Sequence, residues 1–179
     1  MAWTSVYQAR YTKPIVRQLM AIVQRDQRAA LDFVGGPGIL QDIVTYQLAP
    51  LSVPQFPALM IAPERTAFDH EAVGTRHSAN RFYAAIAVTN QDRQVTAELI
   101  QDYVLALDAI FNTVLLSDFY LSLPLTLRHL PPGFTTVPLV GGILKELFVA
   151  SHNYDEIRIK RDQFSGIGIL ELLIDLEEA

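Results

Sequence analysis

Residues 81–111, "RFYAAIAVTNQDRQVTAELIQDYVLALDAIF", change their hydrophobic periodicity halfway along, and no other feature constrains the fold as strongly. The first part, from Phe82 to Thr89, places apolar side chains on both faces of an extended strand. Such a strand is predicted to be central and covered on both sides, or covered on one side by its own chain and on the other by a neighbour. The second part has the period of an amphipathic helix, with Asp92 as a plausible N-cap.

This helix is predicted to have one apolar and one polar side. Its apolar stripe consists of Leu99, Ile100, Tyr103, Ala106, Leu107, Ile110, Phe111 and Val114. Its outer face consists of Glu98, Gln101, Asp108 and Asn112.

A second amphipathic helix is predicted from about Thr12 to Val34. Thr12 can cap it, Pro14 is tolerated in its first turn, and Gly35-Gly36 ends it. The apolar stripe consists of Ile15, Leu19, Ile22, Val23, Ala30 and Phe33, with Arg10, Arg17 and Arg28 on the opposite side. Asp26 falls within this stripe, and we expect a structural role for it, such as a pair with an Arg or a Tyr.

The region between the two helices contains one clear strand, "ALMIA", Ala58 to Ala62, between two prolines. Before it, residues 39–48 can form a short helix, and residues 49–57 read as an extended crossing because three prolines interrupt them. After it, residues 63–80 are polar. They form either a hairpin arm or a loop that projects from the sheet, and their length predicts a functional role.

The C-terminal third begins with an irregular, proline-bearing connector over residues 118–142, with a possible edge strand from Tyr120 to Leu127. "ILKELFVASHNY" fits a helix or a strand equally. "IRIKR" and the closing segment, in which Leu170, Leu172, Ile174 and Leu176 share one face, predict two antiparallel strands. The whole chain, residues 1–179, is therefore predicted to be a single α+β domain, with a mixed, mostly antiparallel sheet flanked by helices.

Composition excludes several classes of function. The chain has no cysteine, which excludes disulfides and thiolate chemistry, and its net charge of -5 argues against an electrostatic grip on nucleic acid. No apolar run is long enough for a membrane span, and the N-terminus lacks the pattern of a secretion signal. Bases gather near the start and acids at the end, so these ends are candidate complementary surfaces, or two ordinary solvated faces.

The histidines do not form a recognisable catalytic or metal-binding motif. His70 and His77 lie in the polar segment beside Asp69 and Glu71, without the spacing that places two metal ligands on one helical face. Ser151 and His152 are adjacent in "SHNYDE", which rarely gives the arrangement of a nucleophile and its base. We therefore expect no catalytic site, no metal and no cofactor.

The order of these elements resembles the tail-terminator, or tail-completion, proteins of long-tailed bacteriophages. The resemblance rests on the basic helix at the start, the "FPALMIAPE" strand, the polar hairpin-like insertion, the strand–turn–helix of residues 81–111, and "HNYDEIRIK" with the final apolar strand. It covers most of the chain as an order of elements, not as a residue motif. The connector over residues 118–142 is longer and richer in proline than in compact members of the family.

The resemblance implies a homohexameric ring in the virion, at the junction of tail and neck, assembled in the host cytoplasm. Such a ring ends polymerisation of the tail tube and passes DNA through its opening without reading it. Its implied partners are the tail tube protein and the neck or head–tail connector protein, with the tail sheath as a further candidate. A connector ring just above the tail and a small-ligand-binding α+β domain are the alternatives.

Two sets of residues are candidates for contacts in such a ring. The subunit-interface candidates are Arg10, Lys13, Arg17, Arg25, Arg28, Glu171, Asp175 and Glu177. The candidates for contact with the tube or neck are Glu64, Arg65, Asp69, His70, Glu71, Arg76 and His77.

Overall fold

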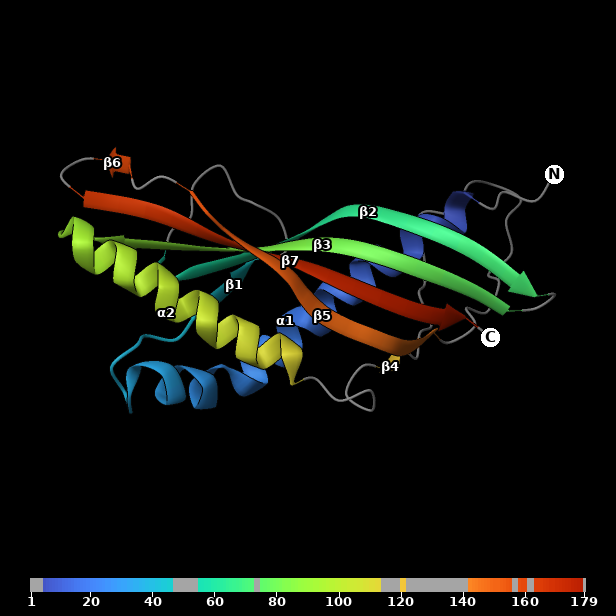
Figure 1. Ribbon diagram of the computed structural model, residues 1–179, viewed down its shortest axis with the longest axis horizontal. Coiled ribbons are helices and arrows are strands. Elements are labelled where there is room, and N and C mark those ends of the chain that lie inside the picture. The colour runs from blue at the N-terminus through green and yellow to red at the C-terminus, as the bar shows by residue number, and fades with distance from the viewer. Residues whose placement is uncertain are drawn as a thin grey trace.

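A computed structural model describes residues 5–46, 55–72, 75–113, 120–121, 142–155, 158–160 and 163–178 (Figure 1). For residues 5–14, 46, 66–72, 75–77, 120–121, 142–144, 158–160 and 176–178 it describes the backbone alone. The elements are α1 (Ser5–Gly35), β1 (Val44–Tyr46), β2 (Ala58–Ala72), β3 (Thr75–Asn90), α2 (Arg93–Asn112), β4 (Tyr120–Leu121), β5 (Gly142–Tyr154), β6 (Arg158–Lys160) and β7 (Gln163–Glu178). Neither of the two described helices is long and apolar enough to cross a membrane.

The strands form one mixed sheet in the order β1-β2-β3-β7-β5-β4, with β6 paired to β7. The β1–β2 pair is parallel, and the other pairs are antiparallel. The predicted fold class, α+β with a mixed, mostly antiparallel sheet, is therefore confirmed. The strand predicted to be central, β3, lies between β2 and β7.

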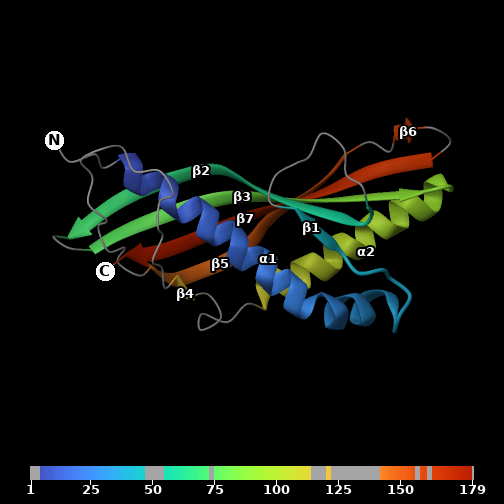
Figure 2. The ribbon, with the colours of Figure 1, turned by 180° about the vertical axis from the view of Figure 1, so that it is seen from behind.

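Both helices pack on one face of this sheet, and Figure 2 shows α1 crossing it obliquely. The core joins buried residues of both helices to one side of the strands: Leu59 and Ile61 of β2, Phe82, Ala84 and Ile86 of β3, and Leu170, Leu172 and Ile174 of β7. Glycine at position 168 lets α2 approach β7, because a Cβ there would lie 2.4 Å from Val104 Cγ2.

Helix α2 follows the prediction closely. The Asp92 carboxylate accepts hydrogen bonds from the backbone N–H groups of Gln94 and Val95, at 2.7 and 3.0 Å, and so caps the helix as expected. The predicted stripe is buried from Ile100 to Phe111, with Leu99 half-buried. Val114, its last predicted member, lies outside the described residues.

Helix α1 differs from the prediction at both ends. It begins at Ser5, so Thr12 is not its cap and Pro14 is not in its first turn. Near its end Leu31 is buried, whereas Phe33 is 86% exposed and does not belong to the core stripe. The reason is that the first half of α1 packs on the sheet, whereas its last turns pack against residues 36–43, so the buried side changes along the helix.

Two strand predictions also needed correction. Strand β2 does not stop at Ala62, because a shift of register between Pro63 and Arg65 accommodates the proline, and pairing then continues to Ala72. Residues 44–46, predicted to be helical, form β1 instead. Residues 49–54 of the predicted crossing lie outside the description.

The polar segment over residues 63–80 is a hairpin arm, the first of the two predicted alternatives. Strands β2 and β3 remain paired as far as Ala72↔Thr75. Strand β3 also pairs with β7 to the end of that strand, at Arg76↔Glu178, so the arm continues the sheet.

The C-terminal third contains the strands that were predicted, and one part of it lies outside the described residues. The ambiguous segment over residues 143–154 is strand β5, and β6 and β7 are antiparallel as expected. Strand β4 lies at the edge of the sheet, where the prolines of the connector predicted it, and residues 122–141 are outside the description.

Candidate functional site

The face of the sheet opposite the helices is covered by no other element in the described part of the chain. We call it the open face and define it by side chains that are half-buried or exposed: Met60, Ala62, Arg81, Tyr83, Ala85, Glu146, Phe148, Ser151, Ile169, Glu171, Leu173 and Asp175. The pairing register places these residues on one side, opposite the core residues that alternate with them. Within the described residues, β3 is covered by its own chain on one side only. The second predicted alternative, in which a neighbour covers the other side, stays a prediction.

The open face is large enough for a specific protein interface. Strands β2, β3, β7 and β5 give it a width of about 19 Å, from a strand spacing of about 4.8 Å. Pairing of β7 with both β3 and β5 extends from Gly168 to Glu178, a length of about 35 Å. The flat area is thus on the order of 600–700 Å², close to the roughly 800 Å² that each partner contributes to a standard interface.

An ion-paired network lies at the centre of the open face. The Arg81 Nε atom is 3.0 Å from Glu171 Oε1 and 3.6 Å from Glu64 Oε2, so this guanidinium bridges β2 and β7. The Ser151 hydroxyl donates a 3.0 Å hydrogen bond to the other oxygen of Glu171, whose side chain is only 18% exposed. A hydrogen bond to Glu64, followed by burial and nearby negative charge, raises the pKa of Tyr83.

Towards the end of β7, the open face carries two carboxylates that are not ion-paired in the described chain, Glu146 and Asp175. Glu146 and Asp175 are direct partners across β5 and β7, and like charges in this position repel. Neither carboxylate has an ion pair within the described residues, although Lys145 lies at the adjoining bulge. Between this rung and the Ser151↔Glu171 rung lies an apolar rung, Phe148↔Leu173.

The basic residues predicted for the interface have different surroundings. Arg17 is exposed on α1 and has no ion pair within the described part of the chain. Arg25 makes two 2.7 Å hydrogen bonds to Asp26, which lower the pKa of Asp26. Asp26 therefore has the structural pairing that was expected, but near the surface.

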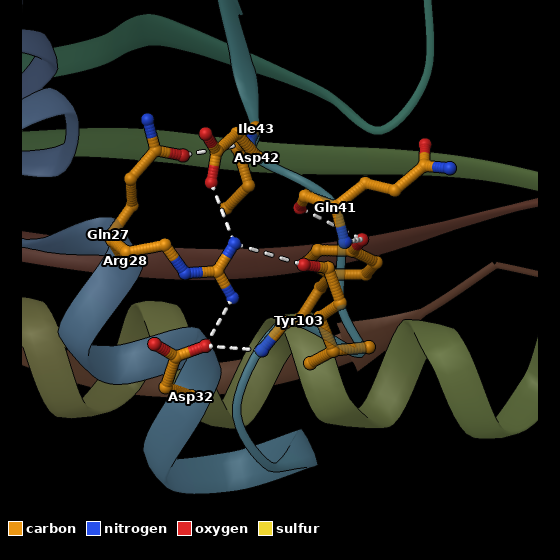
Figure 3. Close-up of polar contacts among 9 residues, drawn as sticks. Gln27, Arg28, Asp32, Gln41, Asp42, Ile43 and Tyr103 are labelled. Atoms are coloured by element: carbon orange, nitrogen blue, oxygen red, sulfur yellow. Dashed lines mark hydrogen bonds and ion pairs between the residues drawn. The ribbon is translucent and has the colours of Figure 1, made fainter.

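Arg28, predicted on the side of α1 opposite the apolar stripe, forms ion pairs within its own chain. Its guanidinium donates to Asp42 at 2.9 Å, to Asp32 at 2.6 Å, and to the carbonyl oxygen of Leu40 at 3.1 Å (Figure 3). The backbone N–H of Gly38 also donates to Asp32, at 2.9 Å. These contacts, first that of Gly38 and then that of Arg28, hold the pKa of Asp32 below its ordinary value.

The same segment is tied to α2 and to α1 by two further contacts (Figure 3). The Tyr103 hydroxyl accepts from the Gln41 N–H and donates to the Gln41 carbonyl oxygen, both at 3.1 Å. The Gln27 side-chain oxygen accepts from the Ile43 N–H at 2.7 Å. Arg28, Asp32 and these residues therefore form a clip that fixes the path from α1 to β1.

A groove of about 400 Å³ lies beside this clip. Three exposed apolar side chains line it, Ile39, Phe56 and Val95, together with the more buried Leu99 and Tyr103. Its lining of apolar side chains with the Tyr103 ring makes it a candidate site for a small ligand.

The predicted residues at the two termini lie at one end of the molecule. Figure 1 shows that α1 begins, β7 ends and the β2–β3 arm turns at the same end. The first turn of α1 and the last residues of β7 are therefore at the same end, whereas Arg25 and Arg28 lie in the last third of α1. The side chains of Arg10, Lys13 and Glu177 are outside the description.

The tube and neck candidates are strand residues. Glu64 and Arg65 are exposed at the bulge of β2. Further along the arm the register pairs Asp69 with His77, and Arg76 with Glu178, whereas His70 and Glu71 fall in a shift of register. The side chains of these five predicted residues, Asp69, His70, Glu71, Arg76 and His77, are outside the description.

Two residues considered for chemistry have structural contacts instead. His152 Nε2 lies 3.1 Å from Asp108 of α2, and Ser151 bonds to Glu171, so the two side chains have different partners. Among the described residues, no group of three or more His, Asp and Glu side chains is placed to hold a metal ion.

Sequence reasoning missed Arg81, Tyr83, Glu146 and Phe148 as members of one surface. The available signal was the apolar character of both faces of β3, which predicted a second covering layer. It did not show which residues of β5 and β7 would complete the surface.

No protein family model matches the chain, and no curated protein matches it. Among solved structures, it is similar to a chain of the virion of native gene transfer agent (GTA) particle. The TM-score is 0.45 and the identity 14%, over 88% of this chain and 91% of that chain. At this level the likeness identifies neither activity nor partners, and the proposals below rest on the residues.

Proposed function

We propose that this chain is a structural protein of a phage virion and forms a homohexameric ring that caps the tail tube. In this role the ring ends polymerisation of the tube and joins the tail to the neck or head. The observation that carries the proposal is the open face, a surface of interface size on a chain whose element order resembles the tail terminators. The chain acts by shape and contact, without catalysis.

A subunit with a helix layer and a sheet layer has the two different surfaces that a ring requires. A closed ring joins one surface of each subunit to a different surface of the next. The open face of the sheet and the outer side of the helix layer are two such surfaces, on opposite sides of the core. A net charge of -5 also suits a conduit through which DNA passes without being held by its phosphates.

The proposed partners are the tail tube protein on one rim of the ring and the neck or connector protein on the other, with the tail sheath as a further candidate. The β2–β3 arm is our candidate for one of these contacts, because it lies at an end of the elongated subunit (Figure 1). The location is the junction of tail and neck, reached from the host cytoplasm.

Two other functions compete with this proposal. A connector ring just above the tail would use the same surfaces and differ only in its neighbours. A small-ligand-binding domain is favoured by one specific observation, the groove of about 400 Å³ beside Ile39 and Val95.

A tube-growth assay tests the proposal. Tail tube protein polymerised with the chain should give tubes that stop growing and carry the chain at one end. Leu173→Lys, on the open face, should abolish this effect, whereas Gln91→Lys, in the exposed turn before α2, should not. Binding to filled heads alone, with tube growth unchanged, would favour the connector ring instead.

A further inference from the structure

We infer that the outer ridge of α1 of one copy packs on the open face of the next copy, with Arg17 against Asp175 and Glu146. This inference rests on the proposed function, because it names the two surfaces that meet in the ring.

The ridge is a continuous exposed row on α1. Arg17, Ala21 and Arg25 follow one another every four residues, and all three are exposed. Each step turns about 40° around the helix axis, so these three side chains can face one flat surface together. The row is about 12 Å long, at about 1.5 Å per residue, so it fits within the length of the open face. The small side chain of Ala21 allows the helix backbone to approach a flat sheet closely.

The order of charged and apolar side chains along the ridge matches their order along the open face. From Arg17 to Arg25 the ridge alternates base, alanine, base, with steps of about 6 Å. Along the sheet, the rungs of Asp175, Leu173 and Glu171 alternate acid, apolar, acid, with steps of nearly 7 Å. Three successive contacts can therefore form in register.

The first of these contacts removes an unfavourable arrangement. Glu146 and Asp175 face each other as like charges without an ion pair in the described chain, and Arg17 is likewise without one. A guanidinium placed between the two carboxylates would satisfy both. At the third contact Arg25 and Glu171 already have partners within their own chain, Asp26 and Arg81, so we expect that contact to be weaker.

The direction of the chain also agrees with ring symmetry. The matched order requires α1 to run opposite to β7 of the neighbouring copy. Within one copy α1 and β7 already run in opposite directions, as Figures 1 and 2 show. Copies related by rotation about an axis along the length of the subunit keep this relation, so stacking the helix layer of one copy on the sheet layer of the next gives the required orientation.

Charge exchange tests the Arg17 contact. Arg17→Glu and Asp175→Arg should each weaken self-association by about tenfold or more, and the double variant should recover most of the loss. Asp175→Arg should leave the subunit folded, because it replaces a like-charged partner of Glu146 with an opposite charge. Arg93→Glu, an exposed reversal on α2, is the matched control and should change nothing. Losses that simply add in the double variant would overturn the contact.

Engineered cysteines identify the two surfaces directly, because the chain has none of its own. Ala21→Cys and Leu173→Cys, mixed as single variants, should form a disulfide between two copies, while neither variant cross-links alone. Cross-linked Leu173→Cys homodimers would show face-to-face packing and refute the inference. A ring of native mass without the mixed disulfide would refute the inference but leave the proposed function standing, whereas a lone subunit at every concentration would refute both.

Discussion

Gly168→Ala provides the most direct test of how the helix layer is attached to the sheet. The new Cβ would lie 2.4 Å from Val104 Cγ2, 3.0 Å from Ile100 Cγ2 and 3.3 Å from Ile86 Cγ2. Replacing a strand glycine usually gains about 0.5–1 kcal/mol of stability through backbone entropy. Overpacking of a buried site costs about 1–3 kcal/mol, and the short contact with Val104 leads us to expect a net loss of about 2 kcal/mol.

A second substitution, at Val104, tests whether contact with this side chain causes the loss of stability in Gly168→Ala. Val104→Ala alone removes two buried methyl groups and should cost about 2 kcal/mol. In the double variant the new Cβ occupies part of the space left by Val104, so its loss should be smaller than the sum of the single losses by at least about 1 kcal/mol. Urea unfolding at fixed protein concentration measures all three, and Gly168→Ala alone should lower Tm by about 4–8 °C. Strictly additive losses, or a Gly168→Ala variant as stable as the wild type, would refute the close packing of α2 on β7.

Four other predictions concern the helices and the clip. Asp92→Ala should lower the unfolding free energy by about 1 kcal/mol through loss of the N-cap, measured by urea denaturation, and Asp92→Asn should retain most of it. Folding lowers the pKa of Asp32, so the contribution of its carboxylate to stability is present above its unfolded pKa and is lost as pH falls through its folded pKa. Asp32→Asn should therefore reduce the fall in Tm below about pH 4. The same fall in Tm in the variant and the wild type would contradict this. Arg28→Gln should increase hydrogen exchange at the backbone N–H of Gly38 without reducing self-association, whereas loss of the oligomer would show that Arg28 belongs to the interface after all. Tyr103→Phe should expose the Gln41 N–H to exchange in the same way.

The elements that sequence predicts well here are those whose signals are local. The period of α2 and its Asp92 cap lie within one segment, and the two-sided apolar pattern of β3 required a central position in any sheet. Each of these features depends on near neighbours in the chain, and each is present in the structure.

The predictions that were wrong depend on contacts between segments that are distant in the chain, which local patterns do not show. Phe33 lies in line with the stripe of α1 but is exposed, because the last turns of the helix pack against residues 36–43 and not on the sheet. The pairs of Arg28 with Asp32 and Asp42 depend on the same packing of residues 36–43 against α1, which the sequence did not predict.

The open face required pairing information that no single strand contains. Whether β5 was a strand could not be decided from its apolar run alone. Glu171 meets Arg81 and Ser151 only through the register of three strands, and bulges at positions 63–65 and 149–151 shift that register. A one-residue error would have moved every one of these side chains to the opposite face.

Native mass spectrometry at micromolar concentration tests most directly whether this chain builds a ring. The account predicts a single closed species of about 120 kDa, six copies of the 20.0 kDa chain, which Leu173→Lys dissociates into folded subunits. A 20.0 kDa species that persists as concentration rises and tail tube protein is added would contradict it.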